Sequence, residues 1–87
     1  MSEFKNPIIS IGLPVFNEEK FLRKKIESIL NQTLQNFELI ISDNASTDKT
    51  SEICQEFLKR DYRIKYFRQE ENIGSVKNFE FVVKEAK

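Results

Sequence analysis

Three short segments of this sequence contain the residues that could bind a small molecule or act on it chemically. The first, residues 14–18, contains the aromatic ring of Phe16, which could stack on a nucleobase. The second begins with Asp43, whose carboxylate could accept hydrogen bonds from a base N–H group or from ribose hydroxyls. The third contains Gly74, which lets a backbone approach a ligand closely or take a positive φ angle. Together they offer the groups that a nucleotide site would use.

Each segment follows a predicted β-strand. The strands are expected at residues 8–13, 37–42 and 63–68. The first two are mostly apolar, which is typical of parallel strands buried on both faces, and the third lies nearer an edge. Pro14 lacks an amide donor and is expected to end the first strand. Because parallel strands end at one edge of a sheet, the segments that follow them should converge there: residues 14–18, 43–48 and 72–75.

Apolar residues between the strands recur at helical spacing. The first helix is expected from about Glu18 to Gln32, with Asn17 at its start and free amides suited to an anionic group. The predicted inward stripes are Phe21, Leu22, Ile26, Ile29 and Leu30; Ile53, Cys54, Phe57 and Leu58; and Val76, Phe79, Val83 and Ala86, with Ser75 as the last cap. The order βαβαβα predicts a three-layer α/β fold with a mostly parallel sheet and right-handed crossovers, like half of a nucleotide-binding fold.

Composition narrows the range of partners. The 87 residues can form one domain at most, and 14 basic and 14 acidic side chains cancel, so no net field favours nucleic acid or an anionic membrane. The single cysteine, Cys54, cannot form an internal disulfide, and the N-terminus lacks the apolar core of a signal peptide. No apolar run approaches the ~20 residues that cross a bilayer. The sequence predicts a cytoplasmic domain with no nucleic-acid partner and no membrane segment.

Several known motifs are missing. No Gly-x-Gly-x-x-Gly follows the first strand and no Gly-Lys-Ser/Thr occurs, which argues against a dinucleotide fingerprint and a P-loop. Residues 43–48 resemble a calcium loop only in part, because Ala45 takes a ligand position. With one cysteine and no histidine, the chain offers no zinc ligand set.

Taken singly, each candidate residue has a purely structural explanation. Phe16 could pack on the first helix as a hydrophobic staple, and Asp43 could serve only its own turn. The remaining candidates could be helix caps (Ser46, Thr47, Asp48) or solvated helix residues (Lys77, Asn78).

The three segments together resemble a known family. The quoted stretches are Ile-Ser-Ile-Gly-Leu-Pro-Val-Phe-Asn-Glu, Phe-Glu-Leu-Ile-Ile-Ser-Asp-Asn-Ala-Ser-Thr-Asp-Lys-Thr and Glu-Asn-Ile-Gly-Ser-Val-Lys-Asn. They are similar to the N-terminal, nucleotide-sugar-binding part of the family 2 glycosyltransferases, enzymes of the GT-A fold that transfer a sugar from a nucleotide donor. The resemblance covers the chain from about residue 7 to residue 87.

The resemblance assigns roles residue by residue. The first nucleotide-binding loop corresponds to Pro14, Val15, Phe16, Asn17 and Glu18. Asp43 corresponds to the acidic residue that contacts the base, and the turn behind it to Asn44, Ser46 and Asp48. The third segment, which helps to close the nucleotide site, corresponds to Gly74, Lys77 and Asn78.

The resemblance also implies what lies outside this chain. In the family, a fourth strand ends in an Asp-x-Asp type motif that binds a divalent metal, Mn or Mg, on the donor diphosphate. No such motif occurs here, so residues 1–87 are expected to be a partial domain with no catalytic residue and no metal ligand of their own. The implied function is part of a glycosyltransferase that uses a nucleotide-diphospho sugar, expected to be UDP-linked.

Two other interpretations follow from the same residues. The chain could be a stand-alone α/β binding or regulatory module without catalysis, and the downstream reading frame distinguishes this from the enzyme. A nucleotidyltransferase is disfavoured because its glycine-rich and basic first loop is missing.

The family's strand order adds one expectation. With the order third, second, first, fourth, the first strand of this chain lies at an open edge, and open apolar edges attract partners. Self-association through the first strand, or through the surface beside it, is therefore expected.

Overall fold

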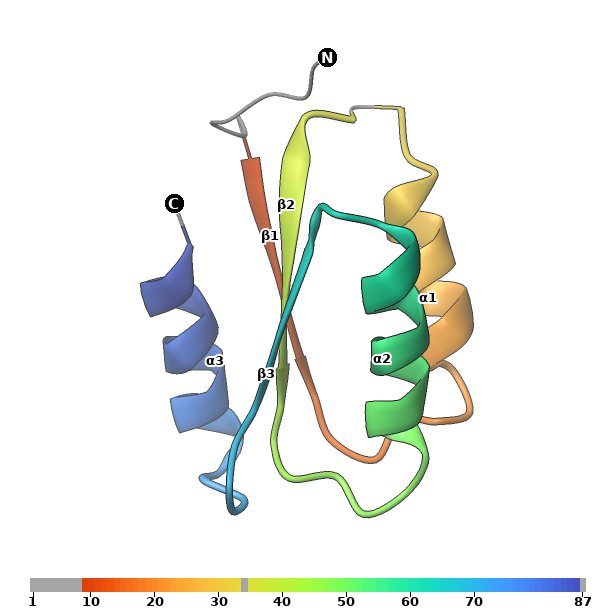
Figure 1. Cartoon of the computed structure of the whole chain (residues 1–87). Coiled ribbons are helices and arrows are strands. Elements are labelled where there is room, and N and C mark those ends of the chain that lie inside the picture. The colour runs from red at the N-terminus through yellow and green to blue at the C-terminus, as the bar shows by residue number, and fades with distance from the viewer. Residues whose placement is uncertain (1–8, 34, 87) are drawn as a thin grey trace.

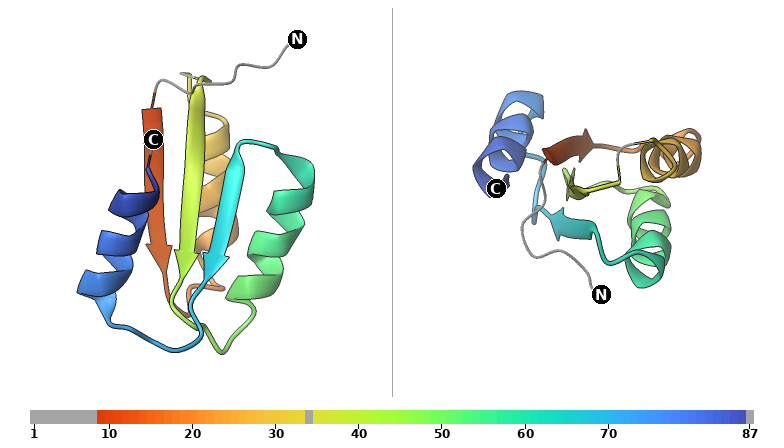
Figure 2. Two further views of the ribbon diagram at one scale, coloured as in Figure 1. Left: turned by 60° about the vertical axis from the view of Figure 1, so that its left-hand side comes forward. Right: turned by 90° about the horizontal axis from the view of Figure 1, so that it is seen from above.

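The computed structural model describes residues 9–33 and 35–86, in which three parallel strands alternate with three helices (Figure 1). Along the chain the elements are β1 (Ile9–Val15), α1 (Leu22–Leu30), β2 (Phe37–Asp43), α2 (Thr50–Arg60), β3 (Ile64–Arg68) and α3 (Ser75–Glu85). The sheet order is β1-β2-β3, and both pairs are parallel. Helices α1 and α2 cover one face and α3 covers the other (Figure 2). The predicted three-layer βαβαβα fold is confirmed.

Strand β2 is the centre of the core. All seven of its residues are buried, because it has a strand on each side and helices on both faces. Phe37, Leu39 and Ile41 point toward α1 and α2, where the core is completed by Leu22, Ile26, Ile53, Cys54 and Phe57. Full burial of each large apolar side chain stabilises the fold by about 1.5–3 kcal/mol. Burial also raises the pKa of the Cys54 thiol to about 12, so this cysteine is an inert core residue, as its place on an apolar stripe predicted.

The face under α3 is packed differently. Gly12 lies directly beneath Val82, and Phe67 meets Phe81 edge to face with ring centroids 5.2 Å apart. Near the start of β2, the buried carboxylate of Glu38 pairs with the Lys65 ammonium group at 2.9 Å. Helix α3 therefore sits close to the sheet through small and aromatic groups rather than through a broad aliphatic stripe.

Strand β1 differs from its prediction in two respects. It continues through Pro14 to Val15, whose carbonyl accepts a hydrogen bond from the Asn44 amide at 2.9 Å. Because residues alternate in direction, the Pro14 nitrogen faces away from β2, and in the described sheet β1 has no second neighbour that would need its N–H group. The strand is also only partly covered, with Ile9 exposed, and not buried on both faces. Residue 8, the predicted first residue of this strand, lies outside the described residues.

Helix α1 starts later than predicted. It runs from Leu22 to Leu30, and the expected first turn is a loop in which Asn17 has a φ angle of 49°. Phe21, expected on the buried stripe, occupies the N-cap position and is exposed. On α2, Leu58 is likewise exposed, whereas the other three residues of its predicted stripe are buried.

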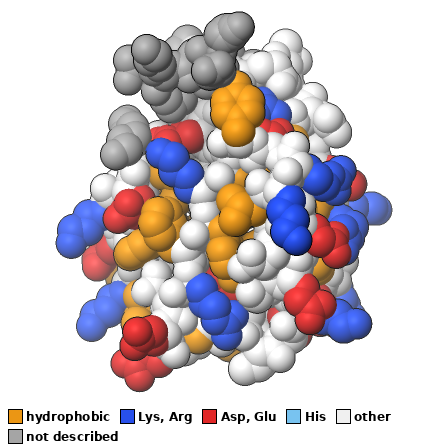
Figure 3. All heavy atoms as spheres, in the orientation of Figure 1, with side chains coloured by type: hydrophobic (Ala, Val, Ile, Leu, Met, Phe, Trp, Pro, Cys, Tyr) orange, Lys and Arg blue, Asp and Glu red, His pale blue; other side chains and the backbone are white. Residues whose placement is uncertain are grey.

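Helix α3 presents the opposite face to the one predicted. Val76, Phe79 and Val83 are exposed at 69%, 58% and 57%, and Ala86 is exposed beyond the end of the helix. The buried residues are Asn78 and Val82. Ser75 is not the cap, because Gly74, with a φ angle of 88°, occupies the N-cap position. The space-filling view shows how orange apolar side chains reach one surface of the molecule between charged ones (Figure 3). No helix among the described residues is long and apolar enough to cross a membrane.

The contact under Val82 gives a prediction about Gly12. A Cβ atom at this position would lie 2.1 Å from Val82 Cγ1, and the β-branched valine has few alternative rotamers. Gly12→Ala should lower the free energy of unfolding by about 1–3 kcal/mol. In urea denaturation, the double variant Gly12→Ala/Val82→Ala should lose less unfolding free energy than the sum of the losses of the two single variants. A Gly12→Ala protein as stable as wild type would show that α3 does not pack here.

The open edge of β1 and the exposed residues of α3 give a second prediction. Because β1 has no second neighbour in the described sheet and apolar side chains are exposed on α3, the chain should form dimers or larger assemblies at micromolar concentration, as sedimentation equilibrium can show. Phe79→Ser should weaken the assembly. Phe21→Ser, which removes an exposed ring near the other helix layer, should not. A wild-type monomer at all concentrations would contradict the prediction.

Candidate functional site

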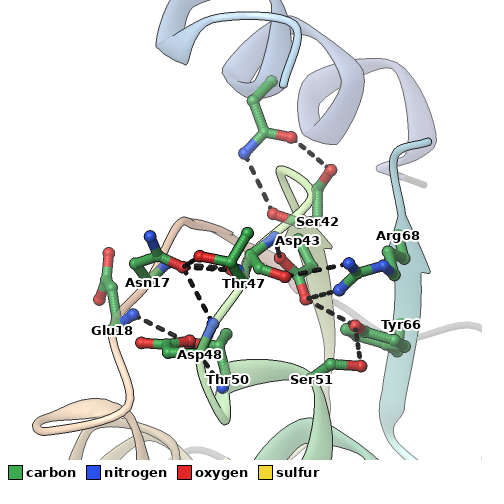
Figure 4. A network of polar contacts seen from close by, with 12 residues as sticks. Asn17, Glu18, Ser42, Asp43, Thr47, Asp48, Thr50, Ser51, Tyr66 and Arg68 are labelled. Carbon is green, nitrogen blue, oxygen red and sulfur yellow. Dashed lines mark hydrogen bonds and ion pairs between the residues drawn. The ribbon is translucent and has the colours of Figure 1, made fainter. Parts of the chain in front are cut away.

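The loops after β1 and β2 are joined by hydrogen bonds (Figure 4). The Asn17 amide donates to the Ser46 hydroxyl at 2.9 Å, and the Asn17 side-chain oxygen accepts from the Thr47 amide at 2.8 Å. The Glu18 amide donates to the Thr50 hydroxyl at 2.8 Å. The left-handed backbone of Asn17 allows this arrangement, since asparagine adopts that conformation more readily than most residues. Asn17 therefore connects the two loops and does not begin α1.

The next residues extend this connection. The Glu19 amide donates to Asp48 at 3.2 Å, and the Lys49 amide donates to Glu19 at 2.8 Å. The second Asp48 oxygen accepts from the Thr50 amide at 2.9 Å at the start of α2. Because the amides of residues 17–19 all have partners in the second loop or at the first residue of α2, they are not the free anion-binding amides that the sequence suggested.

The carboxylate of Asp43 is the centre of the site. It is fully buried, at 0% exposure, at the end of β2. One oxygen accepts from the Ser46 amide at 2.9 Å, and the other accepts from the Tyr66 hydroxyl at 2.7 Å and from Arg68 Nη1 at 3.3 Å. Its partners thus come from the second loop and from β3, where Figure 4 shows Tyr66 and Arg68 beside Asp43.

Tyr66 supplies a neutral donor to this carboxylate. Burial raises its pKa to about 12, and the bond to Asp43 acts in the same direction, because a phenolate beside a carboxylate is unfavourable. The Ser51 hydroxyl lies 3.0 Å from the Tyr66 oxygen. Since the single Tyr66 proton is directed to Asp43, Ser51 donates in this pair. Tyr66 therefore stays protonated at neutral pH.

The third loop is attached through Asn44. Its side chain accepts from the Ile73 amide at 2.8 Å and donates to Asn72 at 3.0 Å. Asn72 in turn accepts from the Gly74 amide at 2.7 Å, which fixes the positive φ angle just before α3. The three segments chosen from the sequence thus lie together at the carboxyl edge of the sheet.

Asn78 has a structural position rather than a solvent-facing one. It is 2% exposed; its side-chain oxygen accepts a hydrogen bond from the Ser42 hydroxyl at 2.6 Å, and its side-chain nitrogen donates one to the Ser42 carbonyl at 3.0 Å. The neighbouring Lys77 is exposed. Of the predicted pair, only Lys77 is therefore available to a ligand.

The predicted residues differ in how much surface they offer. The ring of Phe16 is 43% exposed, and Pro14 and Glu18 are partly exposed. Val15 is buried in the core and contributes its carbonyl to the sheet. Several of the other predicted residues hold the loops together, namely Asn17, Asn44, Ser46 and Asp48. Contact of any of them with a nucleotide stays a prediction.

A groove of about 520 Å³ opens beside the first loop. It is lined by Asn17, Glu18, Glu19, Lys20, Phe21, Lys25 and Asp48. It shares three residues with the predicted set but does not reach Asp43. Among the described residues, no three His, Cys, Asp or Glu side chains gather as metal ligands.

Sequence reasoning missed Tyr66, Arg68, Thr50 and Asn72. Tyr66 and Arg68 lie on the same face of β3, two residues apart, so their period-two spacing was visible in the sequence. The parallel register that places Arg68 opposite Asp43 was not.

A family model described as Glycosyl transferase family 2 matches residues 10–87. The chain belongs to glycosyl transferase family 2. Among the relatives of this family 2 chain are glycosyltransferase GlyG of Streptococcus pneumoniae, 41% identical over 78% of the chain, and an uncharacterised glycosyltransferase of Haemophilus influenzae, 47% identical over 78%. The chain spans only 23% and 27% of the length of these relatives.

Two solved structures share its fold. TarS of S. aureus, in a structure of residues 1–349, superposes with a TM-score of 0.81 at 27% identity, covering 91% of this chain and 24% of TarS. The mannosyltransferase PcManGT of Pyrobaculum calidifontis, solved in complex with GDP-Man and Mn²⁺, gives a TM-score of 0.84 at 20% identity. That match covers 95% of this chain and 25% of PcManGT, and it supports the fold alone.

The environment of Tyr66 gives a prediction about alkaline pH. Its folded-state pKa is raised from 10.0 to about 12, so its contribution to stability is fully present below pH 10 and is lost as pH rises toward 12. Tyr66→Phe should remove this part of the pH dependence of the free energy of unfolding. It should also remove a tyrosinate absorbance transition near pH 12. A wild-type titration without that transition would contradict the burial of Tyr66.

Proposed function

We propose that this family 2 chain forms the nucleotide-binding part of a longer glycosyltransferase, which transfers a sugar from a nucleotide-diphospho sugar to an acceptor. The observation that carries the proposal is the arrangement around Asp43. Loops from all three strands meet at the carboxyl edge of a parallel sheet, which is where open α/β sheets bind ligands. Family membership and the names of the relatives support sugar transfer as the reaction.

The exposed groups have distinct roles in this proposal. The ring of Phe16 stacks on the nucleobase, because it is the half-exposed aromatic side chain next to the converging loops. Lys77, exposed on the first turn of α3, offers a cation to the diphosphate. Asn17, Asn44, Ser46 and Asp48 act by holding the loops in one geometry before the nucleotide arrives.

The cofactor is part of the same proposal. A divalent ion, Mn or Mg, would offset diphosphate charge when bound, and the Mn²⁺ in the PcManGT complex supports its use by proteins of this fold. The described residues do not fit such an ion, since they offer no cluster of three ligands. We therefore assign the ligands of the metal ion to the part of the polypeptide beyond this segment. The proposal also includes a UDP-linked donor and a cytoplasmic location for the enzyme.

Phe16 provides the sharpest test of this function. Phe16→Ala in the full-length protein should weaken binding of UDP roughly 5- to 150-fold in calorimetry, because stacking of a base on an aromatic ring is worth about 1–3 kcal/mol. Its half-exposed ring makes a folding defect small. Tyr62→Ala, which removes an exposed ring after α2, at the other end of the sheet, is the matched control. Equal UDP affinity of wild type and Phe16→Ala would overturn the proposed stacking, and absence of any nucleotide binding would overturn the function.

Replacing Asp43 is a less direct test. Asp43→Ala would leave the Ser46 amide and the Tyr66 hydroxyl without their partner, so it should reduce stability as well as affinity. The UDP affinity of Asp43→Ala is informative only together with a thermal unfolding curve that reports how much of the variant is folded. Ser46→Ala should have the smaller effect on UDP binding, because the Asp43 contact is made by the Ser46 amide, which the substitution keeps.

A further inference from the structure

We propose that Arg68 is a nucleotide-binding residue, held in place by Asp43 and by the Ser46 carbonyl, and that it donates hydrogen bonds to oxygen acceptors of the nucleotide. This inference rests on the proposed function and extends it to a residue that the sequence analysis did not select. Arg68 is the last residue of β3, at the edge where the three loops meet.

The two partners of this ion pair differ in how far they are buried. The Asp43 side chain is 0% exposed, whereas the Arg68 side chain is 43% exposed. A ligand at this edge therefore meets the guanidinium group before it meets the carboxylate. Because the Asp43 carboxylate is fully buried, direct contact of a base with it would require neighbouring groups to move, whereas part of the Arg68 side chain is already exposed.

The guanidinium group has donors to spare. An arginine carries five N–H donors in a planar fork. Within the described part of the chain, Nη1 donates to Asp43 at 3.3 Å and Nη2 donates to the Ser46 carbonyl at 3.0 Å. These two bonds use only part of the fork, and the Arg68 side chain is 43% exposed, so further N–H groups can serve a ligand. Carbonyl oxygens of a base and oxygens of a diphosphate are both suitable acceptors for them.

The hydrogen-bond partners of Arg68 are themselves held in place. Asp43 is itself held by the Ser46 amide and by the Tyr66 hydroxyl, and Ser46 also holds Asn17 of the first loop. A guanidinium group held in this way loses little conformational freedom when a ligand binds. In this arrangement Asp43 is a positioning residue that acts through Arg68.

Substitution of Arg68 in the full-length protein tests the inference. Arg68→Gln should weaken UDP binding roughly ten- to a hundred-fold, the effect of losing a charge-assisted hydrogen bond. Arg68→Lys keeps the charge beside Asp43 but not the planar fork, and it should recover part of the loss. The matched control is Arg60→Gln, which removes the same charge at the far end of α2, roughly 15 Å along the helix from its first residue, Thr50. It should bind UDP like wild type.

Three probes distinguish the acceptor. Calorimetric titrations with uridine, UDP and inorganic pyrophosphate are compared for each variant. Weaker binding of uridine and UDP places the contact on the base or ribose, and weaker binding of UDP and pyrophosphate alone places it on the diphosphate. Either result supports Arg68 as a binding residue.

The outcomes also separate this inference from the function on which it rests. A wild-type protein that binds none of the three probes overturns the proposed function and the role of Arg68 with it. Wild-type binding that is unchanged in both Arg68 variants, with unfolding temperatures confirming folded proteins, overturns the role of Arg68 alone. If Arg68→Gln does not fold, the comparison rests on Arg68→Lys, for which UDP affinity equal to wild type overturns the inference.

Discussion

The buried carboxylate of Asp43 is the constraint on which the rest of the site depends. A charge removed from water is costly unless hydrogen bonds and an opposite charge compensate for it. Here the compensation comes from the Ser46 amide, the Tyr66 hydroxyl and Arg68. These groups can meet only if β3 pairs with β2 in the observed register, with Arg68 opposite Asp43, and if the loop before α2 closes back on the strand end. The buried carboxylate thus links the register of β3 to the closure of the loop before α2.

The same logic extends to the neighbouring loops. Asn17 connects the first loop to the second, and Asn44 connects the second to the third. Asparagine suits both places because its side chain donates and accepts like a peptide group. The consequence for function is that most polar groups of the loops are already occupied. In the function and the inference proposed above, the ligand contacts are therefore assigned to the exposed ring of Phe16, the exposed part of Arg68 and the exposed Lys77, beside loops whose polar groups already have partners.

Sequence reasoning reached the element order and the convergence of the three loops, because both follow from where strands, helices and turns are expected along the chain. Apolar β-branched runs gave the strands, helical spacing gave the helices, and residues such as Asp43 and Gly74 marked the turns. It could not reach features that depend on register across the sheet. Pro14 was expected to end β1, but its nitrogen faces away from β2. No sequence motif marks Arg68 as a site residue. It becomes part of the site only through its position opposite Asp43.

The face that α3 packs against the sheet also depends on hydrogen bonding beside the site. By apolar content alone, Val76, Phe79 and Val83 form the better buried stripe, yet they face outward. The opposite face is chosen because it carries Asn78, whose two bonds to Ser42 satisfy buried groups one residue before Asp43, and Val82, which fits the space above Gly12. Without Asn78 the Ser42 hydroxyl would still accept a hydrogen bond from Gln69 Nε2 at 3.1 Å, but it would lose the acceptor of its own proton. An unsatisfied buried polar group costs about 1–3 kcal/mol, comparable to what burial of one more large apolar side chain would contribute. Hydrogen bonding beside the site therefore sets how the last helix packs, and the apolar stripe it turns outward is a consequence of that choice.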